Sequence, residues 1–158
     1  MKKKAVGLRS AEIVDGDLVL TLNNTMAAIE EGRQAILRHL EGHALDPLVT
    51  NRVEVVFEEI VSNTIRHGFS PGSAQSIRVR VAPRPLAIEL AFEDDGLAFN
   101  PLDVSQPAPF RSLETAQLGG LGVSLVRKLS AAIRYERPPR ARGGAFQPTN
   151  RLTVTLAR

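Results

Sequence analysis

Three polar residues recur at four-residue steps in the stretch EEIVSNTIRHG. An α-helix turns by about 100° per residue, so Glu59, Asn63 and His67 would form one row, whereas Glu58 falls on the opposite flank. A carboxylate and a carboxamide stacked in this way offer oxygen ligands that suit Mg²⁺, and a carboxylate kept off the metal can act as a general base. Taken alone, the spacing favours a solvent-facing polar flank. With further motifs it predicts a magnesium site.

His67 stands directly before Gly68, where a helix is expected to end. A basic residue in the last turn interacts favourably with the helix dipole, and glycine is common just after that turn. The end of a helix therefore explains His67 better than a role as a ligand does.

A second candidate is the aspartate near the end of LAIELAFEDDG. Apolar residues alternate with Glu89 and Glu93 there, and the same alternation places Asp94 on the apolar face of a strand. A carboxylate aimed inward needs donors, because its desolvation is otherwise costly. The exocyclic amine of adenine is one such donor, and nearby backbone N–H groups are another. Asp95 points outward and is expected to be solvated or to cap the turn into Gly96.

Three glycines open the stretch LGGLGVSLVRKL, namely Gly119, Gly120 and Gly122, and the rest of the stretch has the apolar spacing of a helix. Glycine lets the backbone approach a ligand closely, and the first free N–H groups of a helix form an anion site. Phosphate binding is the natural use, although a flexible hinge explains the glycines equally well. The stretch matches neither the P-loop motif nor the dinucleotide fingerprint.

Hydropathy and turn residues indicate the elements that must position these groups. The expected strands are 17–22, 76–82, 86–93, 132–136 and 151–157; the expected helices run from a cap at Asn23 to Thr25 up to Gly42, from Pro47 to Gly68, and onward from Gly119. Strands 76–82 and 86–93 are separated by a short proline-rich connection typical of a hairpin. This order indicates an α+β fold in which helices cover one face of a largely antiparallel sheet.

The second helix carries an apolar stripe beside its polar row. Val53, Val56, Phe57, Ile60 and Thr64 recur at three- and four-residue steps. Such a stripe is expected to press on the sheet. The polar row therefore borders the core.

Two long loops are also expected. The segment 101–118 carries three prolines and little periodicity, and loops of that length inside a compact domain are usually functional. The segment 137–148 contains RPPRARGG and is expected to be a solvated or disordered surface loop, with a contact to a partner as the alternative.

Composition limits the class of protein. The 158 residues suit one domain, 1–158, and 43% hydrophobic with 23% charged residues is ordinary for a soluble protein. There is no apolar run near the ~20 residues that cross a bilayer. The basic start MKKKAVGLRS lacks the apolar region of a secretory signal, so a cytoplasmic location is expected, without membrane partners. The lack of cysteine excludes a disulfide framework and a thiolate metal site.

The charge balance of 20 Lys+Arg against 17 Asp+Glu gives only +3. A nucleic-acid interface usually adds interleaved aromatics or a recognition helix, and aromatic residues make up 4% of this chain. We therefore expect no nucleic-acid partner.

The motifs together, in this order, resemble those of the GHKL ATPase superfamily, which includes gyrase, histidine kinases and MutL and shares the Bergerat fold. EEIVSNTIRHG resembles the N box, EDDGLAFNP the first glycine box with its pattern D-x-G-x-x-F-x-P, and GGLGVSLV the second glycine box. The HG that ends the N box, the FNP and the terminal NRLTVTL are most similar to anti-sigma-factor serine/threonine kinases. The resemblance implies a two-layer sandwich of a mixed, mostly antiparallel sheet covered on one face by three helices.

The resemblance also implies roles for individual residues on the second helix and the strand that follows. Glu59 would be the general base for a serine or threonine hydroxyl, and Asn63 would coordinate Mg²⁺ bridging the phosphates of ATP. Asp94 would bind the adenine amino group, and Gly96 would give the base room. His67 belongs to the same N box and is counted with the nucleotide site.

Further positions of the nucleotide site follow from the two glycine boxes. Phe99 is the aromatic position of the first box. The backbone N–H groups of Gly120, Leu121 and Gly122 would meet the phosphates at the start of the third helix. The loop 101–118 would be the ATP lid, in which Arg111 is the cation able to reach the γ-phosphate.

Two departures from the family pattern are evident in this chain. Ala98 stands where the first glycine box usually has a second glycine, which is expected to stiffen the hinge of the lid. The segment 137–148 is longer than the short turn expected before the last strand.

The resemblance implies phosphorylation of a STAS-type anti-sigma-factor antagonist by Mg-ATP in a partner-switching circuit. The same protein would also hold a sigma factor, and a homodimer is one expected form. Retention of Glu59 favours a kinase over a non-catalytic, ATP-gated binding module, because a pure binder needs no base. A stand-alone ATPase domain of the histidine-kinase type is a third reading.

Overall fold

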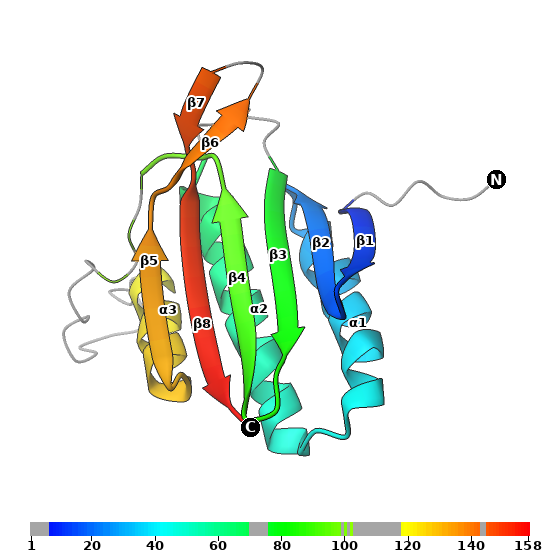
Figure 1. The fold of residues 1–158 in the computed structure, drawn as a ribbon. Helices are drawn as coiled ribbons and strands as arrows, with labels where there is room; N and C mark the ends of the chain where they lie inside the picture. Colours follow the sequence, from blue (N-terminus) through cyan, green and yellow to red (C-terminus); the bar gives the residue numbers. More distant parts are fainter. Residues whose placement is uncertain (1–6, 70–75, 99, 101, 103–117, 143–144) are drawn as a thin grey trace, which may run out of the picture.

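The computed structural model describes residues 7–69, 76–98, 100, 102, 118–142 and 145–158. Within these ranges the chain forms two layers, a six-stranded sheet and three α-helices that lie on one of its faces (Figure 1). The predicted α+β class is therefore confirmed.

The large sheet is antiparallel throughout its described pairs. Its strand order is β1-β2-β3-β4-β8-β5. These strands are β1 (Leu8–Val14), β2 (Asp17–Asn23), β3 (Ser76–Pro83), β4 (Ala87–Asp94), β5 (Ala132–Glu136) and β8 (Asn150–Ala157). The last strand of the chain, β8, thus lies inside the sheet between β4 and β5. Three segments that are separate in the sequence are therefore neighbours in the sheet.

Strand β1 was not predicted from the sequence. It is an edge strand with mostly exposed side chains, so it lacks a clear apolar alternation. The signal that was available is its turn. Asp15 and Gly16 have φ of 52° and 86°, the left-handed pair that an Asp-Gly hairpin turn requires.

The three α-helices are α1 (Ala27–Leu40), α2 (Pro47–His67) and α3 (Leu118–Leu129), and a short 3₁₀ turn, η1 (Glu41–His43), follows α1. The start of α2 agrees with the prediction. Asp46 accepts the backbone N–H of Leu48 at 2.8 Å, and Pro47 occupies the first position. None of the described helices is both long and apolar enough to cross a membrane.

The predicted cap of α1 is wrong. The N-cap is Met26, which makes no side-chain cap bond. Asn23 still belongs to β2, so the turn into α1 is made by backbone groups, and the N–H of Ala28 donates to the carbonyl of Thr25 at 3.1 Å.

The core lies between α2 and the centre of the sheet. Val53, Val56, Phe57 and Ile60 are all at most 6% exposed, which confirms the apolar stripe. Gly32 of α1 faces Phe57, because a Cβ at position 32 would stand 2.6 Å from the end of that ring. This close approach of α1 holds α2 against the sheet, and α2 carries most of the residues predicted to do chemistry.

Two segments differ from the loops that the sequence predicted. Within 137–148, β6 (Pro139–Arg142) and β7 (Ala145–Pro148) pair as a separate hairpin beyond the end of the large sheet (Figure 1). The Gly-Gly pair between them in the sequence is a hairpin signal. Helix α3 begins at Leu118, so Gly119, Gly120 and Gly122 lie inside the helix and not before it.

Candidate functional site

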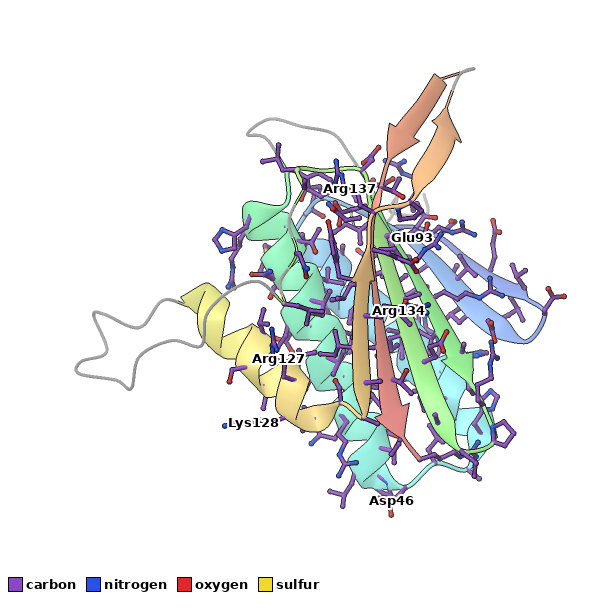
Figure 2. The ribbon with its side chains drawn as sticks, turned by 60° about the vertical axis from the view of Figure 1, so that its left-hand side comes forward. Asp46, Glu93, Arg127, Lys128, Arg134 and Arg137 are labelled. Carbon is purple, nitrogen blue, oxygen red and sulfur yellow. The ribbon has the colours of Figure 1, made fainter. Side chains whose placement is uncertain are left out.

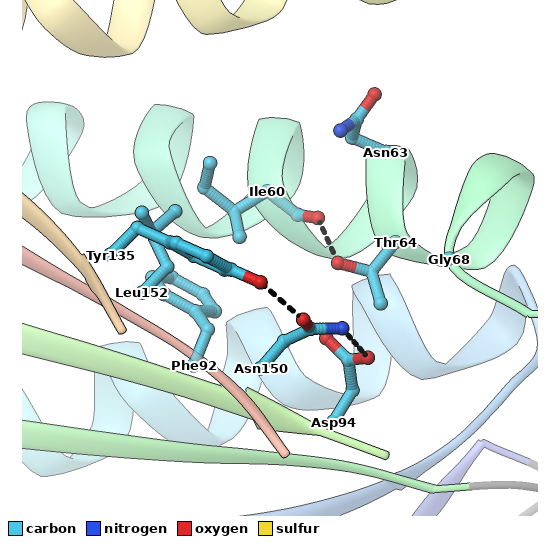
Figure 3. A pocket seen from close by; sticks show the side chains of 9 residues that line it. All are labelled: Ile60, Asn63, Thr64, Gly68, Phe92, Asp94, Tyr135, Asn150 and Leu152. Carbon is cyan, nitrogen blue, oxygen red and sulfur yellow. Dashed lines mark hydrogen bonds between the residues drawn. The ribbon is translucent and has the colours of Figure 1, made fainter. Parts of the chain in front are cut away.

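A hollow that is open to solvent lies between the C-terminal half of α2 and the ends of β4, β5 and β8 (Figure 3). Apolar side chains form part of its wall, and amide, hydroxyl and carboxylate groups converge in it. Its lining residues are Ile60, Asn63, Thr64, Gly68, Phe92, Asp94, Tyr135, Asn150 and Leu152.

Asp94 ends β4 on the helix-covered face, as the alternation of its strand predicts. Its Oδ1 accepts the backbone N–H of Gly96 at 2.9 Å and the side-chain Nδ2 of Asn150 at 2.9 Å. Both of these bonds end on the same oxygen. Asp94 thus caps the turn into Gly96, a role that the sequence analysis offered for Asp95.

Burial raises the pKa of Asp94 above its ordinary value, and the hydrogen bonds from Asn150 and Gly96 act in the opposite direction. The carboxylate thus sits where desolvation disfavours its charge and a small number of donors supports it. A further hydrogen-bond donor in the hollow would therefore stabilise the charged form of this carboxylate.

Asn150 is a site residue that the sequence analysis missed. It is only 6% exposed and lies directly opposite Asp94 in the sheet. The signal was present, because Asn150 continues the inward phase of Leu152, Val154 and Leu156, as Asp94 continues that of β4.

Two glycines join the end of α2 to the turn after β4. The N–H of Leu97 donates to the carbonyl of Gly68 at 2.8 Å. A Cβ at Gly96 would overlap that same carbonyl oxygen and stand 2.9 Å from Asp94 Oδ1. Gly96 is therefore required by the close approach of two backbone segments, which places the end of the N box beside the first glycine box.

The polar row of α2 does not act as one unit. Asn63 lines the hollow from the side of α2 that faces α3, pointing away from the Asp94–Asn150 pair (Figure 3). His67 is exposed in the last turn and does not line the hollow. Residues four positions apart on a helix are offset by about 40° around its axis, so Glu59, Asn63 and His67 do not all point in the same direction. The predicted contact of His67 with a nucleotide stays a prediction.

Glu59 lies half-buried where α2 meets α3. A Cβ at Gly122 would overlap Glu59 Oε2, so the carboxylate rests against the backbone of α3. The structure therefore brings the second glycine box next to the N box, although the two are far apart in sequence.

The glycines of α3 are not equivalent. Gly119, Gly120 and Leu121 belong to its first turn, where the earliest N–H groups have no intrahelical acceptor. Gly122 is the fifth residue, and its N–H falls within the helical ladder. Gly119 and Gly120 are thus better placed than Gly122 as anion donors in this conformation. Phe99 and Arg111, and the lid segment between 103 and 117, lie outside the described residues.

Residues 22–146 match the family described as the histidine kinase-like ATPase domain. The chain belongs to this family. It is also similar to the serine/threonine-protein kinase BtrW of Bordetella bronchiseptica, with 32% identity over 80 residues, which make up 51% of this chain and 56% of that protein. The match thus spans little more than half of the length of that kinase. The mycobacterial sensor histidine kinase MprB gives a TM-score of 0.46 at 17% identity, covering 87% of this chain and 97% of that one.

Membership of the histidine kinase-like ATPase family implies ATP binding, and the chemistry of the groups that line the hollow is compatible with an adenine ring. Ile60, Phe92 and Leu152 supply apolar walls, and Asp94 offers an acceptor. No group of three or more His, Cys, Asp or Glu in the described part of the chain could hold a metal ion.

Proposed function

We propose that the chain is an ATP-dependent protein serine/threonine kinase that phosphorylates a STAS-type anti-sigma-factor antagonist, and that it holds a sigma factor when the antagonist is phosphorylated. One observation carries the proposal. Glu59 stands one helical turn before Asn63 on α2 and against the backbone of α3, so the proposed base, the proposed cation ligand and the second glycine box adjoin one another.

The chemistry follows from these positions. Glu59 accepts the proton of the serine or threonine hydroxyl, whose oxygen forms a bond to the γ-phosphorus while the bond from that phosphorus to ADP breaks. Asn63 would hold Mg²⁺, which offsets the charge of the phosphates. Asp94 orients the nucleotide through its adenine amine, and the first turn of α3 receives the phosphates.

Two features of the comparisons support this function. The relative with 32% identity is named a serine/threonine-protein kinase, and the matching family is an ATPase domain. The antagonist, the sigma factor, a homodimer and a cytoplasmic location are parts of the proposal that the family resemblance suggests.

The experiment mixes the purified protein with γ-labelled ATP, Mg²⁺ and a candidate antagonist. Labelled antagonist supports the kinase. Glu59→Gln should keep ATP binding and lose transfer. Glu58→Gln, an exposed neighbour on the other flank of α2, is the matched control and should transfer normally. Equal transfer by the two variants would remove Glu59 as the base.

A second function is favoured by the contact between Glu59 and Gly122. The proposed base packs against α3 and is half-buried in this conformation, which suits an ATP-gated binding module that never transfers phosphate. Bound ATP without label on any antagonist, in a mixture where complex formation depends on ATP, would support the module instead.

A further inference from the structure

The β6–β7 hairpin is a small sheet of its own. Among the described residues its two strands pair only with each other, in a register that runs from Pro139 opposite Pro148 to Arg142 opposite Ala145. Figure 1 shows the hairpin projecting beyond the end of the large sheet, clear of the three α-helices. Isolated two-stranded hairpins are only marginally stable in water. A further strand from a partner would therefore stabilise this hairpin.

The base of the hairpin is held in place. The backbone N–H of Thr149 donates to the carbonyl of Pro138 at 2.9 Å, and Thr149 is only 2% exposed. Arg137, at the junction of β5 and the hairpin (Figure 2), is half-buried and donates through Nη1 to Asn150 Oδ1 at 2.7 Å. The hairpin therefore starts from a fixed position, directly beside the ends of β5 and β8 that line the hollow.

The sequence of the hairpin carries positive charge and no negative charge. The segment 137–148 contains three arginines and neither Asp nor Glu. By contrast, Arg151 on the following strand β8 has the carboxylate of Glu93 at 2.9 Å. Arg140 and Arg142 stand at alternate positions of β6, and alternate positions of a strand belong to one face. The hairpin thus has a basic face, and its own segment offers no carboxylate to neutralise that charge.

These features favour an acidic protein segment as the partner of the hairpin. Arginine pairs with carboxylates through directed, charge-assisted hydrogen bonds. An extended segment can also add to the open edge of a strand and gain main-chain hydrogen bonds, which would give the hairpin its third strand. Nucleic acid is matched less well, because affinity for its backbone grows with the number of phosphates neutralised, and two arginines neutralise few.

We propose that the β6–β7 hairpin is a docking site for an acidic segment of the protein substrate, bound through Arg140 and Arg142. The inference rests on the proposed function, which requires a protein to approach the nucleotide. It adds the element that holds this substrate and the charge that the substrate must carry. A docking contact away from the reacting atoms stabilises the ground state and the transition state alike, so it lowers the KM for the substrate and leaves kcat unchanged.

The test is steady-state transfer of label from Mg-ATP to the candidate antagonist over a range of antagonist concentrations. The double variant Arg140→Gln/Arg142→Gln should raise the KM for the antagonist about tenfold, the size expected of two surface ion pairs together. Its kcat and its KM for ATP should not change. In the parent the KM for the antagonist should rise with salt, and in the variant this rise should be weaker, because the screened charges have been removed.

The double variant Arg38→Gln/Arg78→Gln is the matched control, because it removes the same charge from exposed positions of α1 and β3. Its KM for the antagonist should equal that of the parent. Arg140→Lys/Arg142→Lys gives a second route if the glutamine variant melts below the parent. Since it keeps both charges, it should keep the salt dependence of the KM.

A second probe needs neither nucleotide nor antagonist. Fluorescence anisotropy at low salt should show that the parent binds a labelled poly-glutamate peptide and that Arg140→Gln/Arg142→Gln binds it about tenfold more weakly. If no label is transferred to the antagonist but binding of this peptide still depends on the hairpin, the proposed function fails and the docking site stands. If label is transferred and neither the KM nor peptide binding responds to the variant, the inference alone fails.

Three further results would overturn the inference. An equal rise of the KM in the control would mean that only net charge matters. A loss of kcat without a change in KM would mean that the hairpin supports the chemistry or the fold. Labelled duplex DNA bound more tightly than the poly-glutamate peptide, and released by Arg140→Gln/Arg142→Gln, would assign the surface to nucleic acid.

Discussion

Gly122 of α3 stands so close to Glu59 of α2 that a Cβ at position 122 would overlap the carboxylate oxygen Oε2. The atom that would be hit is the far end of a flexible side chain, so the clash can be relieved by swinging Glu59 aside. The contact therefore couples the position of α3 to the position of the proposed base.

Gly122→Ala should leave the fold stable and reduce phosphotransfer. Glu59 would be displaced by an ångström or more, and a misplacement of that size can cost about a hundredfold in rate. Thermal melting and transfer of label to an antagonist are the two measurements. An alanine variant with normal transfer would show that the contact has no bearing on the base. A variant that fails to melt cooperatively would show that the glycine serves packing.

Gly96→Ala, in contrast, should destabilise the fold. The Cβ would overlap the backbone oxygen of Gly68, which no rotamer change can move. We expect a loss of about 1–3 kcal/mol in the free energy of unfolding, as for other overpacked sites, measured by urea denaturation. Gly42→Ala is the control, because a Cβ at position 42 would have nothing within 4 Å, and a similar loss there would contradict the explanation.

Asn63→Ala should weaken Mg-ATP binding by more than about tenfold, since loss of even an outer metal contact costs that much, while the melting temperature stays unchanged. Asn51→Ala, an exposed asparagine on the same helix, should bind as the parent does. Calorimetry with and without Mg²⁺ distinguishes the metal from the nucleotide. Unchanged affinity in Asn63→Ala would show that the metal assignment is wrong.

Asp94→Asn should weaken ATP more than it weakens free triphosphate, because the carboxylate is proposed to meet the adenine amine. Burial raises the pKa of Asp94, so the acceptor is lost on acidification at a pH above that of an ordinary aspartate. ATP affinity of the parent should fall as the pH falls through this raised pKa. In Asp94→Asn that fall should be absent. Equal losses for ATP and triphosphate would remove the adenine role.

Asp17 supplies a test away from the site. Its side chain is 2% exposed and bonds Arg84 at 2.7 Å and Arg80 at 2.8 Å. The hydrogen bond from Arg84 holds the pKa of Asp17 below its usual value. A lowered pKa in the folded state stabilises the protein at a pH above the unfolded value, and this contribution is lost as the pH falls through the folded pKa.

Asp17→Asn should therefore cost about 2 kcal/mol at neutral pH, as expected for hydrogen bonds to charged groups. Its melting temperature should fall less than that of the parent as the pH drops below about 4, the ordinary pKa of an aspartate. Parallel acid profiles for the parent and the variant would contradict this role of Asp17.

The fold and much of the candidate site were predictable wherever one periodicity held along a segment. The apolar stripe on α2 was predictable because it depends only on residues within a few turns of one helix. The inward direction of Asp94 was predictable because it depends only on the alternation along one strand. Strand β1 was not predicted because its side chains are mostly exposed, and the β6–β7 hairpin was not predicted because its sequence is weakly patterned. The Asp-Gly and Gly-Gly pairs in the sequence were the available signals.

By itself, the sequence determined the order of the elements, the apolar face of α2, the inward direction of Asp94 and the motifs that indicate a nucleotide site. The tertiary structure alone decided that Asn150 meets Asp94, that Tyr135 and Arg137 bond Asn150, and that Gly122 lies against Glu59. The partners of Asn150 lie between 13 and 56 residues away. Local periodicity sets only the face on which a side chain lies, whereas a contact across segments depends on how the sheet and helices close over one core.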